Sequence, residues 1–165
     1  MHPRAAAVVD RTGKLPLHLA CETGKEWADG LSAIYEAFPD GIRQAENNPR
    51  GWLPLHMVAS NANSSPGLVV KVLEAYPEGV TVADSDGNYP LHLACYSGKH
   101  WATGLEALFD AGPGVLSYSN KSGLPSFQIV ALKYCTPNGS ADLLQEASEL
   151  ETMFQLLRAD PTVIA

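Results

Sequence analysis

The sequence predicts an all-α fold, a solenoid of about four helix-turn-helix units with a modified C-terminal unit. Two observations carry this prediction: a motif that recurs at a nearly constant interval, and apolar residues at helical spacing after each copy of it. Because two short helices cannot bury enough apolar surface alone, neighbouring units must stack and share one core. We therefore expect residues 1–165 to form a single repeat array.

Each copy of the motif opens with a glycine, and in the first three copies Pro-Leu-His follows three residues later. The fourth copy keeps the glycine and the apolar pattern, but Gln128 replaces the histidine and Pro125 is shifted by one place. The glycines stand at positions 13, 51, 87 and 123, and the histidines with Gln128 keep the same intervals. The predicted units are 10–47, 48–83, 84–119 and 120–165.

The segment before the first unit is predicted to be the tail of a preceding unit. The interval from Pro3 to Gly13 equals the interval from Pro77 to Gly87, and Pro77 belongs to the end of the second unit. We therefore assign residues 1–9 to such a tail and expect the chain to be the remainder of a longer array.

The first half of each unit reads as a turn followed by a helix. Asp10, followed three residues later by glycine, is typical of a tight turn, since glycine accepts a positive φ. Proline then opens the helix, where its missing N–H costs nothing. Leu17, Ala20 and Cys21 fall at i, i+3 and i+4, which indicates one helical face, and Gly24 ends the helix.

A second helix closes each unit and shows the same apolar spacing. A proline ends it at one constant interval after the histidine in the first three units, but later in the fourth, which indicates a 12-residue insertion there. A long amphipathic run in the fourth unit is predicted to be a C-terminal cap, with an apolar face made by Leu144, Ala147, Leu150, Met153, Phe154 and Leu157. The markers of the second helices are Leu31, Ile34 and Tyr35, then Val69, Val72 and Leu73, then Leu105, Leu108 and Phe109.

The pattern Asp-x-x-Gly-x-(Leu/Tyr)-Pro-Leu-His-x-Ala-Cys resembles the ankyrin repeat, and the resemblance covers nearly the whole chain. The units here are 36 to 38 residues long rather than about 33, and the threonine usual before the proline is Leu15, Leu53 or Tyr89. We interpret the chain as a divergent ankyrin array with lengthened loops between its helices. The resemblance implies that the motif histidines hydrogen-bond to the backbone of neighbouring turns.

Composition argues against several partners. A net charge of -7 and an isoelectric point near 5.1 lack the basic character that nucleic acid or anionic lipid requires. No apolar run approaches the length of a membrane span, and the first residues do not read as a signal peptide. We expect a cytoplasmic protein with no nucleic-acid and no membrane partner.

No catalytic, metal or cofactor site is predicted. His18, His56 and His92 occur once per unit, and helices about 8–10 Å apart hold them too far from one another to share an ion. Cys21 and Cys95 lie two units apart, beyond disulfide reach, and are predicted to be buried reduced thiols. Gly-Lys pairs at 24–25 and 98–99 lack the other glycine and the Ser/Thr of a phosphate loop. We therefore expect no enzyme.

The predicted function is a non-catalytic protein–protein interaction module that uses the concave face of the solenoid. Its partner is a protein of unknown identity, and the chain is a monomer or part of a longer array. The large aromatics Trp52 and Tyr96 are the expected hot spots. The predicted contact residues are Arg11, Lys14, Glu22, Arg50, Trp52, Asn61, Asp86, Asn88 and Tyr96.

Two alternatives remain open at this point. The chain could be the structural end segment of a longer repeat protein whose binding surface lies upstream. It could also hold a small ligand-binding or enzymatic site in the enlarged fourth unit, which a pocket with titratable residues between Lys133 and Glu151 would favour.

Overall fold

The computed structural model describes residues 3–134 and 143–159, and apart from one isolated β-bridge between Ser119 and Pro125 their regular elements are all helices. This confirms the all-α prediction for the described residues. The α-helices are α1 (Pro3–Ala6), α2 (Pro16–Glu22), α3 (Leu31–Ala37), α4 (Pro54–Ser60), α5 (Pro66–Ala75), α6 (Pro90–Ser97), α7 (Leu105–Ala111), α8 (Ser126–Tyr134) and α9 (Leu143–Ala159). Short 3-10 helices lie between them: η1 (Trp27–Asp29), η2 (Pro39–Arg43), η3 (Pro77–Thr81), η4 (Trp101–Thr103) and η5 (Pro113–Ser117).

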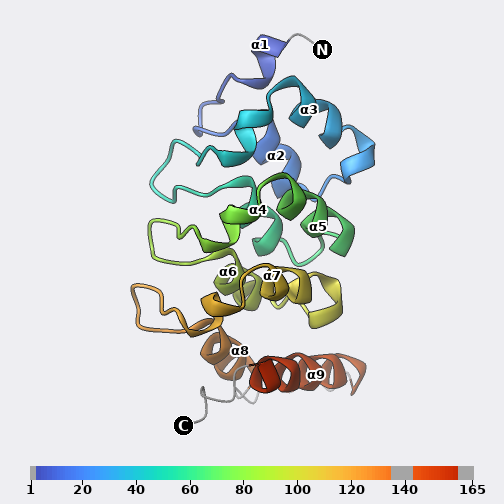
Figure 1. Cartoon of the computed structure of the whole chain (residues 1–165), viewed down its shortest axis with the longest axis vertical. Helices are drawn as coiled ribbons and strands as arrows, with labels where there is room; N and C mark the ends of the chain where they lie inside the picture. The colour runs from blue at the N-terminus through green and yellow to red at the C-terminus, as the bar shows by residue number, and fades with distance from the viewer. Residues whose placement is uncertain (1–2, 135–142, 160–165) are drawn as a thin grey trace.

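Successive helix pairs lie one below another along the long axis of the molecule (Figure 1). The first helices form one row, in which α2 packs on α4, α4 on α6 and α6 on α8. In the second row α5 packs on α7, and α9 lies against both α8 and η4. The turns that connect one pair to the next project together on one side of the stack (Figure 1).

Each of these turns is fixed by one short polar side chain. Asp10 Oδ1 accepts the amide of Thr12 at 2.8 Å, and the side-chain oxygens of Asn48, Asp84 and Asn120 each accept the amide two residues on at 2.9 Å. The glycine three residues after each of them has a positive φ of 65° to 79°. This is the Asx-turn geometry that Asp and Asn favour, so the turn is encoded within four residues.

The motif histidine joins the start of its own helix to backbone further along the chain. His18 Nδ1 accepts the amide of Leu15 at 3.1 Å, and its Nε2 donates to the carbonyl of Gln44 at 2.9 Å. His92 Nδ1 repeats the first bond with the amide of Tyr89, but its Nε2 donates to the carbonyl of Leu124 in the following unit, a position that corresponds to Trp52 rather than to Gln44. An amide can only donate and a carbonyl can only accept, so these imidazoles are neutral Nε2–H tautomers. The predicted structural role is confirmed for these two histidines.

The predicted apolar faces form one continuous core. Leu17, Cys21, Leu91 and Cys95 are each 2% exposed or less, and the burial of Cys21 raises the pKa of its thiol to about 12. The prediction of two buried thiols is thus confirmed; Cys135 lies outside the described residues. The tryptophans that begin η1 and η4 pack at a tilt against aromatics of the following helices, Trp27 against Tyr35 and Trp101 against Phe109.

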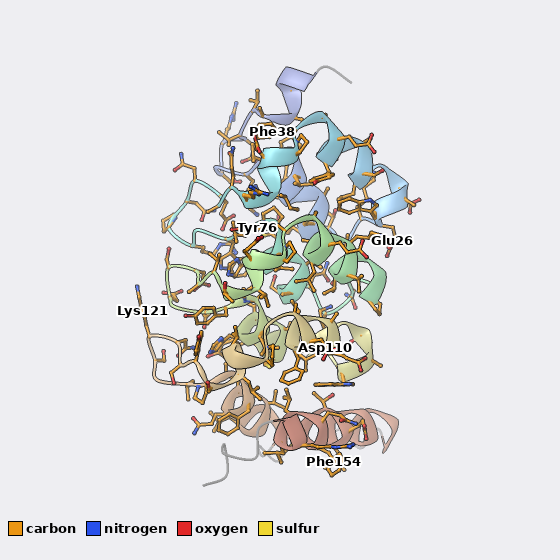
Figure 2. All side chains as sticks on the ribbon, viewed as in Figure 1. Glu26, Phe38, Tyr76, Asp110, Lys121 and Phe154 are labelled. Atoms are coloured by element: carbon orange, nitrogen blue, oxygen red, sulfur yellow. The ribbon has the colours of Figure 1, made fainter. Side chains whose placement is uncertain are left out.

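The C-terminal helix is present, but the prediction of its buried face is wrong in part. Thr152 and Leu156 are 1% exposed and face the stack, whereas Leu150 is 66% and Phe154 58% exposed. Phe154 points away from the stack at the end of the molecule (Figure 2). The angle at which α9 lies on α8 and η4 selects the buried side, and the period of the apolar residues alone does not reveal that angle.

Protonation of the buried histidines should weaken the fold. Burial is the main cause that lowers the pKa of His56 from 6.5 to about 4, against the opposing carboxylate of Asp84. The unfolded chain therefore binds more protons below pH 6.5, so the free energy of unfolding is fully retained above that pH. It should fall by up to about 3 kcal/mol as the pH drops towards 4.

Urea unfolding from pH 7 to pH 4 of the wild-type chain and of His56→Gln measures this effect. The glutamine side chain has no proton to bind, so the stability difference between the two proteins should shrink as the pH falls. A difference that stays constant over this range would contradict the assignment. Burial also lowers the pKa of His18 and His92, so both proteins should retain a smaller slope of the same sign.

Candidate functional site: the surface of turn tips and first helices

Two positions recur at the same register in each unit. One is the residue directly after the turn glycine, and the other lies eight residues further on, at the end of the first helix. We call the set the tip–helix surface. Its members are Lys14 and Glu22, Trp52 and Ser60, Asn88 and Tyr96, and Leu124 and Leu132.

In the first unit these two positions form an ion pair. Lys14 Nζ lies 2.6 Å from Glu22 Oε2, and the lysine side chain is only 11% exposed, against 42% for the glutamate. Both residues were predicted to contact a partner. Lys14 is instead paired with Glu22 of its own unit, and Glu22 is the more exposed residue of the pair.

In the second unit Trp52 links two units together. Its indole N–H donates to Asp84 Oδ2 at 2.9 Å, and the guanidinium of Arg50 lies 4.4 Å from the centre of its ring. Arg50 also pairs with the buried carboxylate of Glu46 at 3.2 Å, although its own side chain is 45% exposed. Trp52 is half-buried, so a structural role accounts for much of its area and only part of the ring can meet a partner.

In the third unit the surface is open and aromatic. Asn120 Nδ2 donates to Asn88 Oδ1 at 2.9 Å and to the Tyr96 hydroxyl at 3.3 Å. The Tyr96 side chain is nonetheless 46% exposed. This bond holds the phenol by its tip, while a large part of the residue remains in contact with solvent.

In the fourth unit the same two positions are leucines. Leu124 is half-buried, and Leu132 is 57% exposed. Along the stack the surface therefore changes from a charged pair to an aromatic and finally to an aliphatic pair. Sequence analysis missed Leu132, although its position eight residues after Leu124 is the signal that finds it.

The other predicted contact residues lie around this surface. Arg11 and Asp86 are exposed at turn tips, and the Asp86 carbonyl accepts the amide of Lys121 from the next tip. Figure 2 places Lys121 at the outer edge of the tips, on the side opposite Glu26 and Asp110. Asn61 is half-buried, and its side chain donates to the carbonyl of Glu22 at 3.0 Å.

Lys99 is a buried cation that the sequence did not predict. It is 2% exposed, and its Nζ donates to the carbonyls of Asn61 and Ser64 and to the Ser64 hydroxyl. Burial lowers the pKa of this ammonium to about 8. The Gly-Lys pair at 98–99 therefore holds backbone oxygens of the preceding unit.

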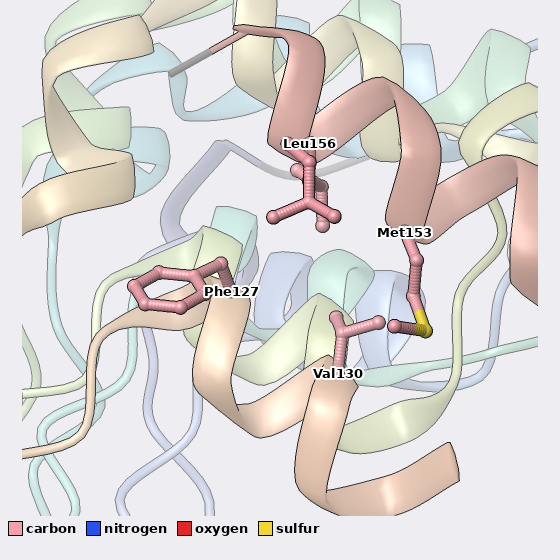
Figure 3. Close-up of a pocket in the computed structure, with 5 residues that line it drawn as sticks. Phe127, Val130, Met153 and Leu156 are labelled. Atoms are coloured by element: carbon pink, nitrogen blue, oxygen red, sulfur yellow. The ribbon is translucent and has the colours of Figure 1, made fainter. Parts of the chain in front are cut away.

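The described part of the fourth unit offers an apolar crevice rather than a polar site. A hollow of about 30 Å³ between α8 and α9 is lined by Phe127, Val130, Met153, Leu156 and Leu157 (Figure 3). None of these side chains titrates, so the crevice does not support the enzymatic alternative. Residues 135–142 of the insertion lie outside the described residues.

Within residues 3–134 and 143–159, no group of three His, Cys, Asp or Glu side chains is placed to hold a metal ion. None of the helices in these segments combines the length and apolar character that a membrane crossing requires.

A scan against protein-family models finds no matching family, and a search of curated proteins finds no matching sequence.

The bond between Trp52 and Asp84 should contribute measurably to stability. Trp52→Phe keeps a ring beside Arg50 but removes the indole N–H, so we expect a loss of about 1–2 kcal/mol in the free energy of unfolding. Asp84→Asn keeps an oxygen for the turn amides and removes the charged acceptor. Urea unfolding of both single variants and the double variant completes a mutant cycle. The two losses should not add, because they remove the same bond; strict additivity would show that the bond contributes nothing.

Proposed function

We propose that this chain is a non-catalytic protein–protein interaction module of the ankyrin-like solenoid class, and that the tip–helix surface binds its protein partner. One observation carries the proposal: side chains on this surface change chemistry from unit to unit while the turns and histidines beneath them repeat. In repeat proteins a constant framework positions a surface whose side chains vary, and that surface is the binding surface.

The solenoid assignment draws support from the stacking of α2, α4, α6 and α8 and from the recurring Asx turns. The ankyrin-like assignment draws support from the Pro-Leu-His helix starts and from the histidine bonds to backbone further along the chain. Function follows from the surface itself rather than from the fold, since one fold hosts many functions.

The footprint should centre on the third and fourth units. Tyr96 and Leu132 are the two large apolar side chains of the tip–helix surface that are more than a third exposed. Desolvation of such residues provides most of the binding free energy at interfaces, and charged pairs such as Lys14 and Glu22 contribute specificity at the rim. The expected partner therefore presents an apolar patch flanked by polar groups.

Single substitutions can test this surface. A photo-crosslinking residue at position 96 should capture a partner from an extract of the source cells, and the same residue at position 70 should not. With the captured partner in hand, Tyr96→Ala and Leu132→Ala should each weaken binding by about 2 kcal/mol, or roughly thirtyfold in Kd.

Val70→Ala and Glu106→Ala are the matched controls. Val70 is 39% exposed on α5 and Glu106 is exposed on α7, so both lie on second helices away from the tip–helix surface. Circular dichroism confirms that each variant folds. If Tyr96→Ala and Leu132→Ala fold and bind as tightly as the controls, the tip–helix surface is not the binding surface.

A further inference from the structure

The face of the first unit that points away from the second exposes residues whose counterparts in later units are buried. Leu19 is 38% exposed, whereas its counterparts Met57 and Leu93 are 0% and 7% exposed. Lys25 is exposed, whereas its counterpart Lys99 is 2% exposed. The preceding unit makes this difference, because it covers the same face of the second and third units.

The third unit shows what such a lysine binds. Lys99 Nζ lies 2.9 Å from the Asn61 carbonyl, 2.9 Å from the Ser64 hydroxyl and 3.3 Å from the Ser64 carbonyl. An ammonium has three N–H donors, so this loop of the second unit satisfies them all without a carboxylate. The 61–64 loop is thus a binding site for a lysine side chain from the unit that follows.

A glycine beside that lysine makes room for a valine of the same preceding unit. A Cβ built on Gly104 would lie 2.8 Å from Val69 Cγ2, so only glycine allows the two units to approach this closely. The counterpart in the first unit is Gly30, and there a Cβ would meet nothing nearer than Lys25 Cε at 3.7 Å. The place that Val69 fills beside Gly104 is open beside Gly30.

The first unit repeats both features within one stretch of sequence. Residues 24–31 and 98–105 share Gly-Lys-x-Trp-Ala-x-Gly-Leu, and the second unit has no such stretch at 62–69. The glycine adopts a positive φ in both copies, 99° at Gly30 and 119° at Gly104. The first unit therefore presents the same lysine and glycine that the third unit uses to bind the second.

At this face α1 occupies the place that η3 occupies at the third unit. α1 packs against α3, as η3 of the second unit packs against α7 of the third. Pro3 and Pro77 begin these two segments, each at the same interval before its turn glycine. Beside α1 lies an open hollow of about 380 Å³, whose lining includes Val8, Pro16 and Leu19.

We propose that Leu19, Lys25 and Gly30 form a docking surface for one further helix pair of the second unit's kind, placed beside α1. Lys25 would enter its Asn-x-x-Ser loop, and a branched side chain in the place of Val69 would pack on Gly30. This end surface is distinct from the tip–helix surface, so either proposal can fail without the other.

A tandem chain tests the proposal. Residues 1–76 are joined to Pro3 of a complete second copy, so that Tyr76 precedes Pro3 as it precedes Pro77. Lys25 of the first copy is changed to Arg, which makes the two peptides distinguishable by mass spectrometry.

Acetylation of lysine amines is then followed over time. In the single chain Lys25 should react quickly and Lys99 slowly; in the tandem chain Lys25 of the second copy should react about tenfold or more slowly than in the single chain.

A second tandem is the matched control. Residues 1–38 joined to Pro3 place a first unit, which lacks the 61–64 loop and Val69, against the same face. Lys25 should stay reactive in that chain. The proposal is wrong if Lys25 reacts at the single-chain rate in the 1–76 tandem, if that tandem does not melt in one cooperative transition, or if both tandems protect Lys25 equally. It is also wrong if sedimentation shows that the single chain self-associates with Lys25 protected, since the occupant is then a second copy.

Discussion

The neutral imidazole at the start of α2 and of α6 is the constraint on which the stack depends. His18 Nδ1 accepts the amide that precedes its own helix, and its Nε2 donates to the carbonyl of Gln44 near the end of its unit, while His92 Nε2 donates to Leu124 of the next unit. One side chain thereby fixes both where the helix begins and how far away the next turn lies. A charged imidazole would turn Nδ1 into a donor facing another donor, so the arrangement exists only while the histidine is neutral.

This constraint explains why so much of the fold could be predicted from the sequence. The turn is decided within four residues by Asp10 or its counterparts and a glycine of positive φ. The helix start is decided by proline, and α2, α4 and α6 all begin at the predicted residue. Signals of this kind are local, so a single sequence displays them wherever the turn or helix requires them.

What could not be predicted depends on neighbours rather than on local sequence. Lys25 and Lys99 have nearly the same flanking residues, yet one is exposed and the other is 2% exposed, because only Lys99 meets the 61–64 loop. Trp52 was predicted to contact a partner, and its bond to Asp84 reaches 32 positions along the chain. Contacts between residues so far apart in sequence are set by packing between units, and a short stretch of sequence does not reveal that packing.

Residues at the interfaces between units and residues on the tip–helix surface are restricted by different contacts. A residue at an interface between units, such as Gly104, is limited by the side chain that faces it, here Val69. A residue on the tip–helix surface lies beside the stack, so a charged pair, an indole, a phenol or a leucine can occupy equivalent positions over the same turn. Substitutions at its exposed positions, such as Glu22 and Leu132, usually change stability little, unlike those at Trp52, which bonds to the next unit. The exposed part of the proposed binding surface can therefore change its chemistry while the interfaces between units preserve the fold.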